Sequence, residues 1–454
     1  MIYVTTSATV RKHQVNFDDL FSDKTSSDWG TRGKPSDTVT KVYDRLPSKL
    51  RTTPISRYIL MLHDFNAKYY DKTLAQIKQF EALSPKDRYK VKDTSSKIAE
   101  LYGEYAAAED EIREAEIMKQ IEMLENEMET SPEYAYRTFD LRKKSAPAGV
   151  PTYKLPKKHR RTINAPNHEL YNVLAELKLL LEYIMPENYH TSAYAYVKGR
   201  CTVDAIKKHQ QWDSHWFAKF DFSNFFGSTT LPWLIKQLET IYPFSTIMMT
   251  EFRRGNTVYN GREELIKALE LCFLDGGLPQ GTPISPLITN IMMIPFDHIV
   301  SNKLGKDMDE RFCYTRYADD IHISCHVSFN VKEIEKYIID VLHDLEAPFS
   351  LNTAKTHYGS RAGGNWNLGL MLNKDNKITV GSENKRMLKA DLNNFYLDHK
   401  NGLDWELSKV YQLQGKLSYY KSIETEVINM IIAGFNKKYH TDIEKLIKSK
   451  IKQI

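Results

Sequence analysis

Cysteine is scarce in this chain, and its placement excludes two kinds of protein. Four cysteines occur among 454 residues. None forms a Cys-x-x-Cys pair and none has a histidine partner in a zinc-binding pattern, which argues against a disulfide scaffold and a cysteine-based zinc site. Each lies in or beside an apolar run, so we expect buried free thiols and a reducing compartment. The four are Cys201, Cys272, Cys313 and Cys325.

Long hydrophobic runs are missing as well. No apolar stretch reaches the ~18 residues that a membrane-spanning helix needs, and the N-terminus lacks the layout of a signal peptide. We therefore expect a cytoplasmic protein without membrane contact. No internal repeat is visible. The length and the hydrophobic content of 41% are sufficient for two or three globular domains.

A strong excess of one charge is also absent: the chain has 63 basic and 58 acidic residues, which gives a net charge of only +5. This balance permits nucleic-acid binding without requiring it, so local clusters matter more. The segment 142–161 has eight Lys and Arg residues and no acidic one, and 437–452 has six lysines and two acidic residues. Each cluster is either a solvated face or a phosphate-binding surface.

Helical and mixed segments alternate along the chain. Residues 55–126 have helical patterning, which is clearest at 106–129, where Ile117, Ile121, Leu124 and Met128 recur at helical spacing. This apolar stripe either docks on the body of the protein or mediates self-association. Prolines at 147 and 151 mark a boundary, mixed strands and helices follow to about 385, and helical periodicity then returns.

The most informative segment is Tyr317-Ala318-Asp319-Asp320. It lies between two runs of alternating apolar residues, 312–317 and 321–324, a pattern typical of a β-hairpin. The hairpin tip would hold two adjacent carboxylates, which repel each other and bring no evident benefit to folding. A divalent cation would relieve that repulsion. Taken alone, the tetrapeptide is more typical of an ordinary solvated turn.

Two upstream segments change this interpretation. Asp221 ends a strand-like run, 216–220, and a loop rich in glycine and proline at 276–287 leads into an apolar helix-like stretch, 288–293. A carboxylate strand, a glycine-rich loop before a helix and a two-carboxylate hairpin, in this order, resemble the palm of a reverse transcriptase. Residue types and spacing agree at all three sites.

This resemblance implies an α+β fold of the right-hand polymerase type, with fingers, palm and thumb. We expect a mostly helical N-terminal extension at 1–145, fingers and palm at 146–385 and a helical thumb at 386–454.

The resemblance also implies a metal site. Asp221, Asp319 and Asp320 would hold two Mg²⁺ ions, and the backbone carbonyl of Phe222 would complete the site. Manganese can substitute, because it shares the preference for oxygen ligands. Lys355 is similar to the family lysine that protonates the departing pyrophosphate; an ordinary exposed lysine is the alternative.

Further matched positions would contact the incoming nucleotide. Phe226 is similar to the aromatic residue that clashes with a 2′-hydroxyl and so selects deoxynucleotides; the alternative is a core role for it. Gln280 would lie near the triphosphate and sugar, and Gly281 would allow the backbone to approach the nucleotide or template.

A basic segment resembles the fingers strands, in which a lysine and an arginine clamp the triphosphate. Arg161 suits bidentate phosphate contact, and its partner would be Lys157 or Lys158.

The implied activity is RNA-directed DNA synthesis, with an RNA template, a DNA primer or product and deoxynucleotides as partners. The block order is retron-like, but the retron Asn-Ala-x-x-His and Val-Thr-Gly blocks are not reproduced, which favours a related stand-alone or antiviral-defence enzyme that copies a dedicated non-coding RNA. A homo-oligomer could form through the N-terminal extension. Template-independent or protein-primed synthesis, and a non-catalytic nucleic-acid-binding scaffold, are the alternatives.

Overall fold

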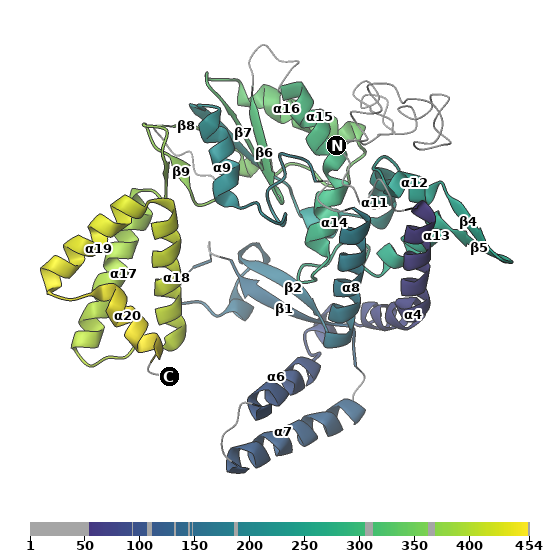
Figure 1. Cartoon of the computed structure of the whole chain (residues 1–454), viewed down its shortest axis with the longest axis horizontal. Coiled ribbons are helices and arrows are strands. Elements are labelled where there is room, and N and C mark those ends of the chain that lie inside the picture. Colours follow the sequence, from purple (N-terminus) through teal and green to yellow (C-terminus); the bar gives the residue numbers. More distant parts are fainter. Residues whose placement is uncertain are drawn as a thin grey trace. The chain divides into compact units, whose positions relative to one another are not determined.

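The computed structural model describes residues 54–452, apart from 93, 107–110, 131–132, 144–145, 148, 186–188, 305–311 and 362–367. The chain divides into two units, between which it passes several times (Figure 1). Unit 1 comprises the chain up to Thr191 together with Phe222–Ile299 and Tyr337–Leu351, and unit 2 comprises Ser192–Asp221, Val300–Lys336 and Asn352–Ile454. No helix among the described residues is long and apolar enough to cross a membrane.

Unit 1 begins with α4 (Ile55–Glu81), which starts directly after Pro54. Its buried face packs against α8 (His168–Ile184) and α13 (Gly261–Glu270). A polar contact accompanies this packing, because the buried Glu264 carboxylate accepts a hydrogen bond from Asn66 Nδ2 at 2.7 Å and lies 2.9 Å from His63 Nδ1. The first described helix is therefore built into unit 1 by apolar and polar contacts.

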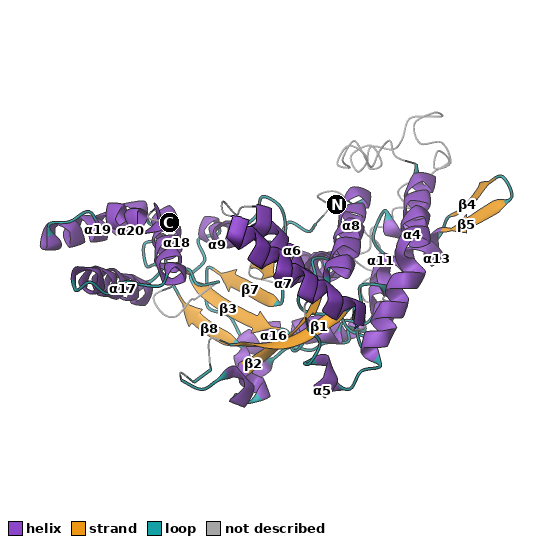
Figure 2. Cartoon of the chain, turned by 90° about the horizontal axis from the view of Figure 1, so that it is seen from below, coloured by secondary structure: helices purple, strands orange, loops and turns teal. Residues whose placement is uncertain are grey.

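The next two helices form a pair, α6 (Thr94–Ala106) and α7 (Glu111–Thr130), which lie side by side in Figures 1 and 2. The helical prediction for 55–126 is confirmed. Ile117 and Ile121 are buried against Leu101 of α6. The apolar stripe thus has a partner within the chain. The first 53 residues of the predicted extension lie outside the described residues.

The basic segment that was predicted to form fingers strands contains β2 (Arg160–Pro166), which pairs antiparallel over its full length with β1 (Tyr136–Arg142). The short helices η2 (Thr152–Lys154) and η3 (Lys157–His159) lie between them in sequence. Since β1 precedes residue 146, it falls inside the predicted N-terminal extension. Prolines at 147 and 151 indicated a boundary there, but they lie in the connection between two paired strands.

Unit 1 also contains an aromatic cluster and several shorter elements. Phe225 and Phe349 pack at 5.0 Å between ring centroids, and Trp233 contacts Phe349 at 5.2 Å. The helices are α5 (Pro85–Arg88), α10 (Phe225–Ser228), α11 (Leu231–Leu238), α12 (Phe244–Met248) and α14 (Ser285–Met292), and a hairpin is formed by β4 (Glu251–Arg254) and β5 (Thr257–Asn260). Both α15 (Ile294–Asn302) and α16 (Val331–Asp344) begin in one unit and end in the other.

Unit 2 contains a four-stranded antiparallel sheet in the order β6-β7-β3-β8. The outer strands are β6 (Cys313–Tyr317) and β8 (His357–Ser360), and the inner ones are β7 (Asp320–Cys325) and β3 (Trp216–Asp221). Helix α9 (Thr202–Gln211) contacts β6, and η5 (Thr353–Lys355) precedes β8. A two-stranded ladder of β9 (Met371–Leu372) and β10 (Ile378–Thr379) also contacts α9.

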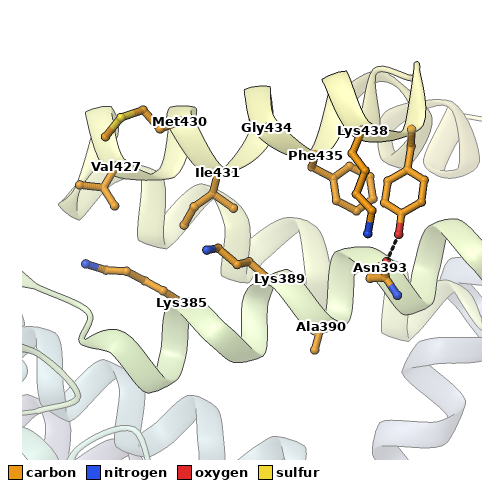
Figure 3. Close-up of a pocket in the computed structure, with 11 residues that line it drawn as sticks. Lys385, Lys389, Ala390, Asn393, Val427, Met430, Ile431, Gly434, Phe435 and Lys438 are labelled. Carbon is orange, nitrogen blue, oxygen red and sulfur yellow. Dashed lines mark hydrogen bonds between the residues drawn. The ribbon is translucent and has the colours of Figure 1, made fainter.

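Unit 2 ends in a helical module. Its helices are α17 (Ser382–Lys400), α18 (Leu407–Ile423), α19 (Thr425–Tyr439) and α20 (Ile443–Lys452), and all four contribute to one apolar core. A groove of about 710 Å³ between α17 and α19 combines the lysines Lys385, Lys389 and Lys438 with apolar side chains that include Ile431 and Phe435 (Figure 3). The helical prediction for this region is confirmed.

The cysteine prediction is correct at three positions and wrong at one. Cys272, Cys313 and Cys325 are buried free thiols, and burial raises the pKa of Cys313 to about 12. Cys201 is exposed because it stands at the N-terminus of α9, where its Sγ lies 3.1 Å from an Asp204 carboxylate oxygen.

We predict that Glu264→Ala destabilises the protein more than Glu263→Ala does. Both residues lie in the first turn of α13, but only Glu264 is buried and bonded to α4. Its loss would leave the Asn66 amide and the His63 ring without this partner, at a cost of about 1–3 kcal/mol. Urea unfolding of the two variants measures the difference. Equal midpoints would show that the polar contact does not stabilise the packing of α4.

Candidate active site

The predicted carboxylate hairpin is present. β6 and β7 are antiparallel with Tyr317 opposite Asp320, so the turn consists of Ala318 and Asp319 alone. Ala318 has a φ of 57°, in the left-handed region that non-glycine residues adopt rarely. The guanidinium of Arg316, a fully buried residue, donates from Nη1 to the Ala318 carbonyl at 3.0 Å. Arg316 therefore supports the turn that carries the carboxylates.

Asp221 meets this hairpin through strand pairing. It ends β3, lies directly opposite Asp320 of β7 and is 9% exposed. Asp319 is the adjacent residue of the turn. Three predicted carboxylates from different parts of the sequence thus lie at one end of a single sheet. Like charges directly opposite each other on neighbouring strands are destabilising, so this end of the sheet needs compensating positive charge.

Two lysines supply positive charge. Lys355 Nζ lies 2.8 Å from Asp221 Oδ2, and Lys219 Nζ lies 2.9 Å from Asp320 Oδ1. Lys355 was predicted as a site residue from the sequence, whereas Lys219 was missed. The signal for it was available: residues two apart on a strand share a face, so Lys219 lies on the same face as Asp221. Each carboxylate of the opposed pair therefore has its own ammonium partner.

The residues at this end of the sheet fit divalent cations. Oxygen ligands from several carboxylates are what Mg²⁺ and Mn²⁺ prefer, and the opposed pair is an arrangement that a cation would stabilise. Phe222 lies opposite Leu351 in an antiparallel bridge. The two hydrogen bonds of this bridge are made by the neighbouring residues, from Ser223 N–H to the Ser350 carbonyl and from Asn352 N–H to the Asp221 carbonyl. The carbonyl of Phe222 itself therefore points away from Leu351. The Phe222 ring is buried against Phe225 and Phe349, so only its backbone can serve a ligand.

Two buried histidines line the sheet near these charges. His322 of β7 is opposite Lys219, and burial, Lys219 and His209 together hold the pKa of His322 well below its ordinary value. Burial also lowers the pKa of His209 to about 3, and its ring bonds Ser324 at 2.5 Å and Thr315 at 2.8 Å. Both rings are therefore neutral at physiological pH and add no positive charge beside the lysines.

The predicted aromatic pair in unit 1 divides into two roles. Phe225 is buried in the aromatic cluster, whereas Phe226 is only half-buried. The Phe226 carbonyl accepts a hydrogen bond from the Leu278 N–H at 3.0 Å. A Cβ at Gly277 would lie 2.3 Å from the Gly227 carbonyl oxygen, so only glycine permits this approach. The glycine-rich loop is thus held beside Phe226.

The same loop contacts strand β2. The Asn164 N–H donates to the Gln280 carbonyl at 2.9 Å, and Gly281 has a φ of 122°. A Cβ at Gly281 would lie 2.9 Å from Ile163 Cγ2 and 3.0 Å from the Asn164 carbonyl oxygen. Glycine is therefore required here by the backbone conformation and by the close approach to β2.

Hydroxyl groups as well as prolines shape this loop. Thr282 Oγ1 and Ser285 Oγ are 2.6 Å apart, and Ser285 Oγ donates to the Pro279 carbonyl at 2.9 Å. The predicted helix after the loop is confirmed as α14.

The predicted fingers residues are exposed. Arg161 lies on the same face of β2 as Ile163, which contacts Gly281, since residues two apart on a strand share a face. Its neighbour Arg160 lies on the other face and pairs with Asp140 at 2.7 Å. Arg161 is thus on the loop side of β2. The other two candidates are exposed in η3: Lys157 and Lys158.

The structure collects the predicted residues in two groups, one in each unit. Unit 2 holds the charged residues Asp221, Asp319, Asp320 and Lys355 at the end of its sheet. Unit 1 holds the nucleotide-contacting candidates Phe222, Phe226, Gln280, Gly281, Arg161, Lys157 and Lys158.

Comparison with known proteins identifies the family of the chain. The family described as "Reverse transcriptase (RNA-dependent DNA polymerase)" matches residues 141–374, more than half of the chain. The chain is 27% identical over 338 residues to the Retron Ec83 reverse transcriptase of Escherichia coli, covering 71% of this chain and 97% of that protein. It is 28% identical over 295 residues to the Retron Ec73 reverse transcriptase of the same organism, covering 61% and 84%.

Among solved structures, the chain is similar to telomerase from Candida albicans in complex with a TWJ fragment of telomeric RNA, with a TM-score of 0.38 and 12% identity. That match covers 64% of this chain and 62% of the telomerase chain. The family match and the curated relatives establish the assignment: the chain belongs to the reverse transcriptase family and is a retron-like RNA-directed DNA polymerase.

Proposed function

We propose that this enzyme adds deoxynucleotides to a primer by two-metal nucleotidyl transfer at Asp221, Asp319 and Asp320. The observation that carries the proposal is the register that places Asp221 opposite Asp320, with Asp319 in the adjoining turn. Two Mg²⁺ ions bound there would lower the pKa of the primer 3′-hydroxyl and stabilise the charge of the triphosphate, and Mn²⁺ can substitute. The Phe222 carbonyl would be a further oxygen ligand.

The protein's own residues would orient the nucleotide and move one proton. Lys355, which lies 2.8 Å from Asp221, is placed to donate a proton to the departing pyrophosphate. Arg161, with Lys157 or Lys158, would bind the triphosphate. All three side chains are exposed. Arg161 lies on the side of β2 that faces the glycine-rich loop, and the two lysines lie in η3, directly before β2. Gln280 and Gly281 would meet the sugar and triphosphate or the template.

We propose that the template is a dedicated structured RNA, within a retron-like or antiviral-defence system. Two observations support RNA binding. The first is the groove between α17 and α19, where Lys389 and Lys438 lie beside apolar side chains (Figure 3). The second is a set of exposed basic residues in and between β1 and β2: Arg142, Lys154, Lys157, Lys158 and Arg161. Ammonium groups bind phosphates, and apolar or aromatic side chains can support bases and sugars. The DNA product and the primer would be further partners.

We predict that Asp319→Ala combined with Asp320→Ala abolishes synthesis. Loss of metal ligands removes several kcal/mol of transition-state stabilisation, so incorporation of labelled deoxynucleotides should fall about a thousandfold or more. Asp340→Asn, at an exposed position of α16, is the control and should retain activity. The assay uses purified protein with and without its co-purified RNA. Incorporation by the double variant would contradict the site, and product covalently attached to the protein would indicate protein priming.

Phe226→Ala should weaken discrimination against ribonucleotides. If the half-buried ring excludes a 2′-hydroxyl, its truncation lowers the ratio of kcat/KM for deoxynucleotides over ribonucleotides by about tenfold to a hundredfold. The matched control is Phe252→Ala, another half-buried phenylalanine of unit 1. Single-nucleotide incorporation kinetics measure the ratio. An unchanged ratio in Phe226→Ala would assign this ring to packing alone.

Lys219→Met should make stability more dependent on divalent cations. Without the ammonium near Asp320, the opposed carboxylates lose one compensating charge, and in EDTA we expect the Tm to fall by about 2–4 °C, the shift for roughly 1 kcal/mol. Added Mg²⁺ should restore more Tm in this variant than in the unmodified protein. Lys267→Met, at an exposed position of α13, controls for the loss of a charge. An identical Mg²⁺ response in both variants would show that Lys219 does not compensate the site.

A further inference from the structure

A second group of potential metal ligands lies at the other end of the β3–β7 pair. Asp213 Oδ2 is 3.6 Å from His215 Nε2 and 3.7 Å from His326 Nδ1, and the three ligand atoms all lie within 4.8 Å of one another. The two imidazole rings are 4.4 Å apart between centroids. Asp213, His215 and His326 thus form a group of three potential metal ligands within the described part of the chain.

Strand ends hold these residues in place. The His215 N–H donates to the Cys325 carbonyl at 2.9 Å, which extends the β3–β7 ladder by one bond, and His326 is the next residue after Cys325. On the other side of β3, the Arg361 N–H donates to the His215 carbonyl at 2.7 Å, just past the end of β8. Asp213 has a φ of 48° in the turn after α9. The backbone therefore brings the three side chains together without a ligand.

The spacing suits a tetrahedral metal. Zinc binds imidazole nitrogen at about 2.0–2.1 Å and carboxylate oxygen at about 2.0–2.2 Å, so neighbouring ligand atoms of a tetrahedral site are roughly 3.4 Å apart. The carboxylate oxygen lies 3.6 and 3.7 Å from the two imidazole nitrogens, close to this value, and all three ligand atoms lie within 4.8 Å of one another, so side-chain rotation can bring them to it. Two imidazoles and one carboxylate also form a donor set suited to zinc and its neighbours rather than to magnesium.

The three residues also have partners within the protein. His326 Nδ1 lies 3.1 Å from the Asp213 carbonyl oxygen. The Arg361 guanidinium bonds Asp213 Oδ1 at 2.7 Å and lies 2.8 Å from His215 Nε2. A metal on Asp213 Oδ2 would leave the Arg361 bond to Oδ1 in place and would displace the guanidinium only from His215. Arg361 would then be a neighbouring hydrogen-bond donor that orients the ligating carboxylate.

We propose that Asp213, His215 and His326 form a binding site for a divalent transition metal, with Zn²⁺ as the preferred ion. The fourth position of the tetrahedron is filled by water. The bound ion links the residue that precedes β3 to the residue that follows β7, and so ties together the two strands that carry Asp221 and Asp320 at their other ends. This site is separate from the carboxylate site in position and in donor chemistry.

Zinc titration of the full-length protein tests the proposal. The protein is stripped with EDTA, exchanged into excess Mg²⁺ so that oxygen-only sites are filled, and titrated with ZnCl₂ against a chromogenic chelator. We expect one Zn²⁺ per chain, with affinity at least about tenfold weaker in His326→Ala and in Asp213→Asn. The control variant is His343→Ala. The His343 side chain is 89% exposed and lies on α16, so this variant should bind Zn²⁺ as the unmodified protein does.

Two further measurements separate a built site from loss of folding or from surface binding. Co²⁺ should give the visible absorption of a tetrahedral nitrogen–oxygen site in the unmodified protein and in His343→Ala, but not in His326→Ala. Zn²⁺ should raise the Tm of the first two proteins only, and far-ultraviolet circular dichroism should be the same for all. Absence of stoichiometric Zn²⁺ binding, or Zn²⁺ affinity that His326→Ala leaves unchanged, would overturn the proposal.

Discussion

Repulsion between carboxylates that are held together at one end of a β-sheet is the constraint on which the rest of this structure depends. The register that sets Asp221 opposite Asp320 is not set by these charges, which oppose it. It is set by the buried pairs behind them, because a slip of one residue would carry the apolar side chains to the wrong face. These pairs are Phe220 with Ile321 and Ala218 with Ile323. Hydrophobic burial therefore stabilises the arrangement that electrostatics alone would separate.

Compensation of these charges comes from partly exposed lysines rather than from deeply buried partners. Lys219 and Lys355 can leave the carboxylates and return to solvent without stranding a buried charge, so a cation can replace them at little cost. A protonated His322 would add positive charge close to Lys219, but burial keeps its pKa well below the ordinary value. The two ammonium groups that contact the opposed carboxylates can thus move aside for a metal, whereas the buried Arg316 guanidinium stays under the turn.

Sequence patterns predicted the parts of the site that are local in the chain. The hairpin, the strand before Asp221 and the helix after the glycine-rich loop follow from alternation, loop composition and apolar spacing. Patterns did not predict two kinds of feature: a strand whose partner lies elsewhere in the chain, and a residue whose burial departs from what is usual for its type. Arg316 is fully buried under its own turn although arginine is usually exposed, and β1 is a strand because β2 pairs with it. Cys201 is exposed because a helix begins beside it.

The histidine cluster shows the same dependence, because more than one hundred residues separate His215 from His326 and only the β3–β7 register joins them. That register also fixes its relation to the carboxylates. The six residues of β3 span about 20 Å at ~3.3 Å per residue, more than twice the ~8 Å Debye length at physiological salt. An ion at the histidine end would thus have little direct electrostatic effect on Asp221 and Asp320. Any influence would pass through the backbone. The ion would oppose fraying of the β3–β7 ladder, and the last pair of that ladder, Asp221 with Asp320, sets the distance between the two carboxylates.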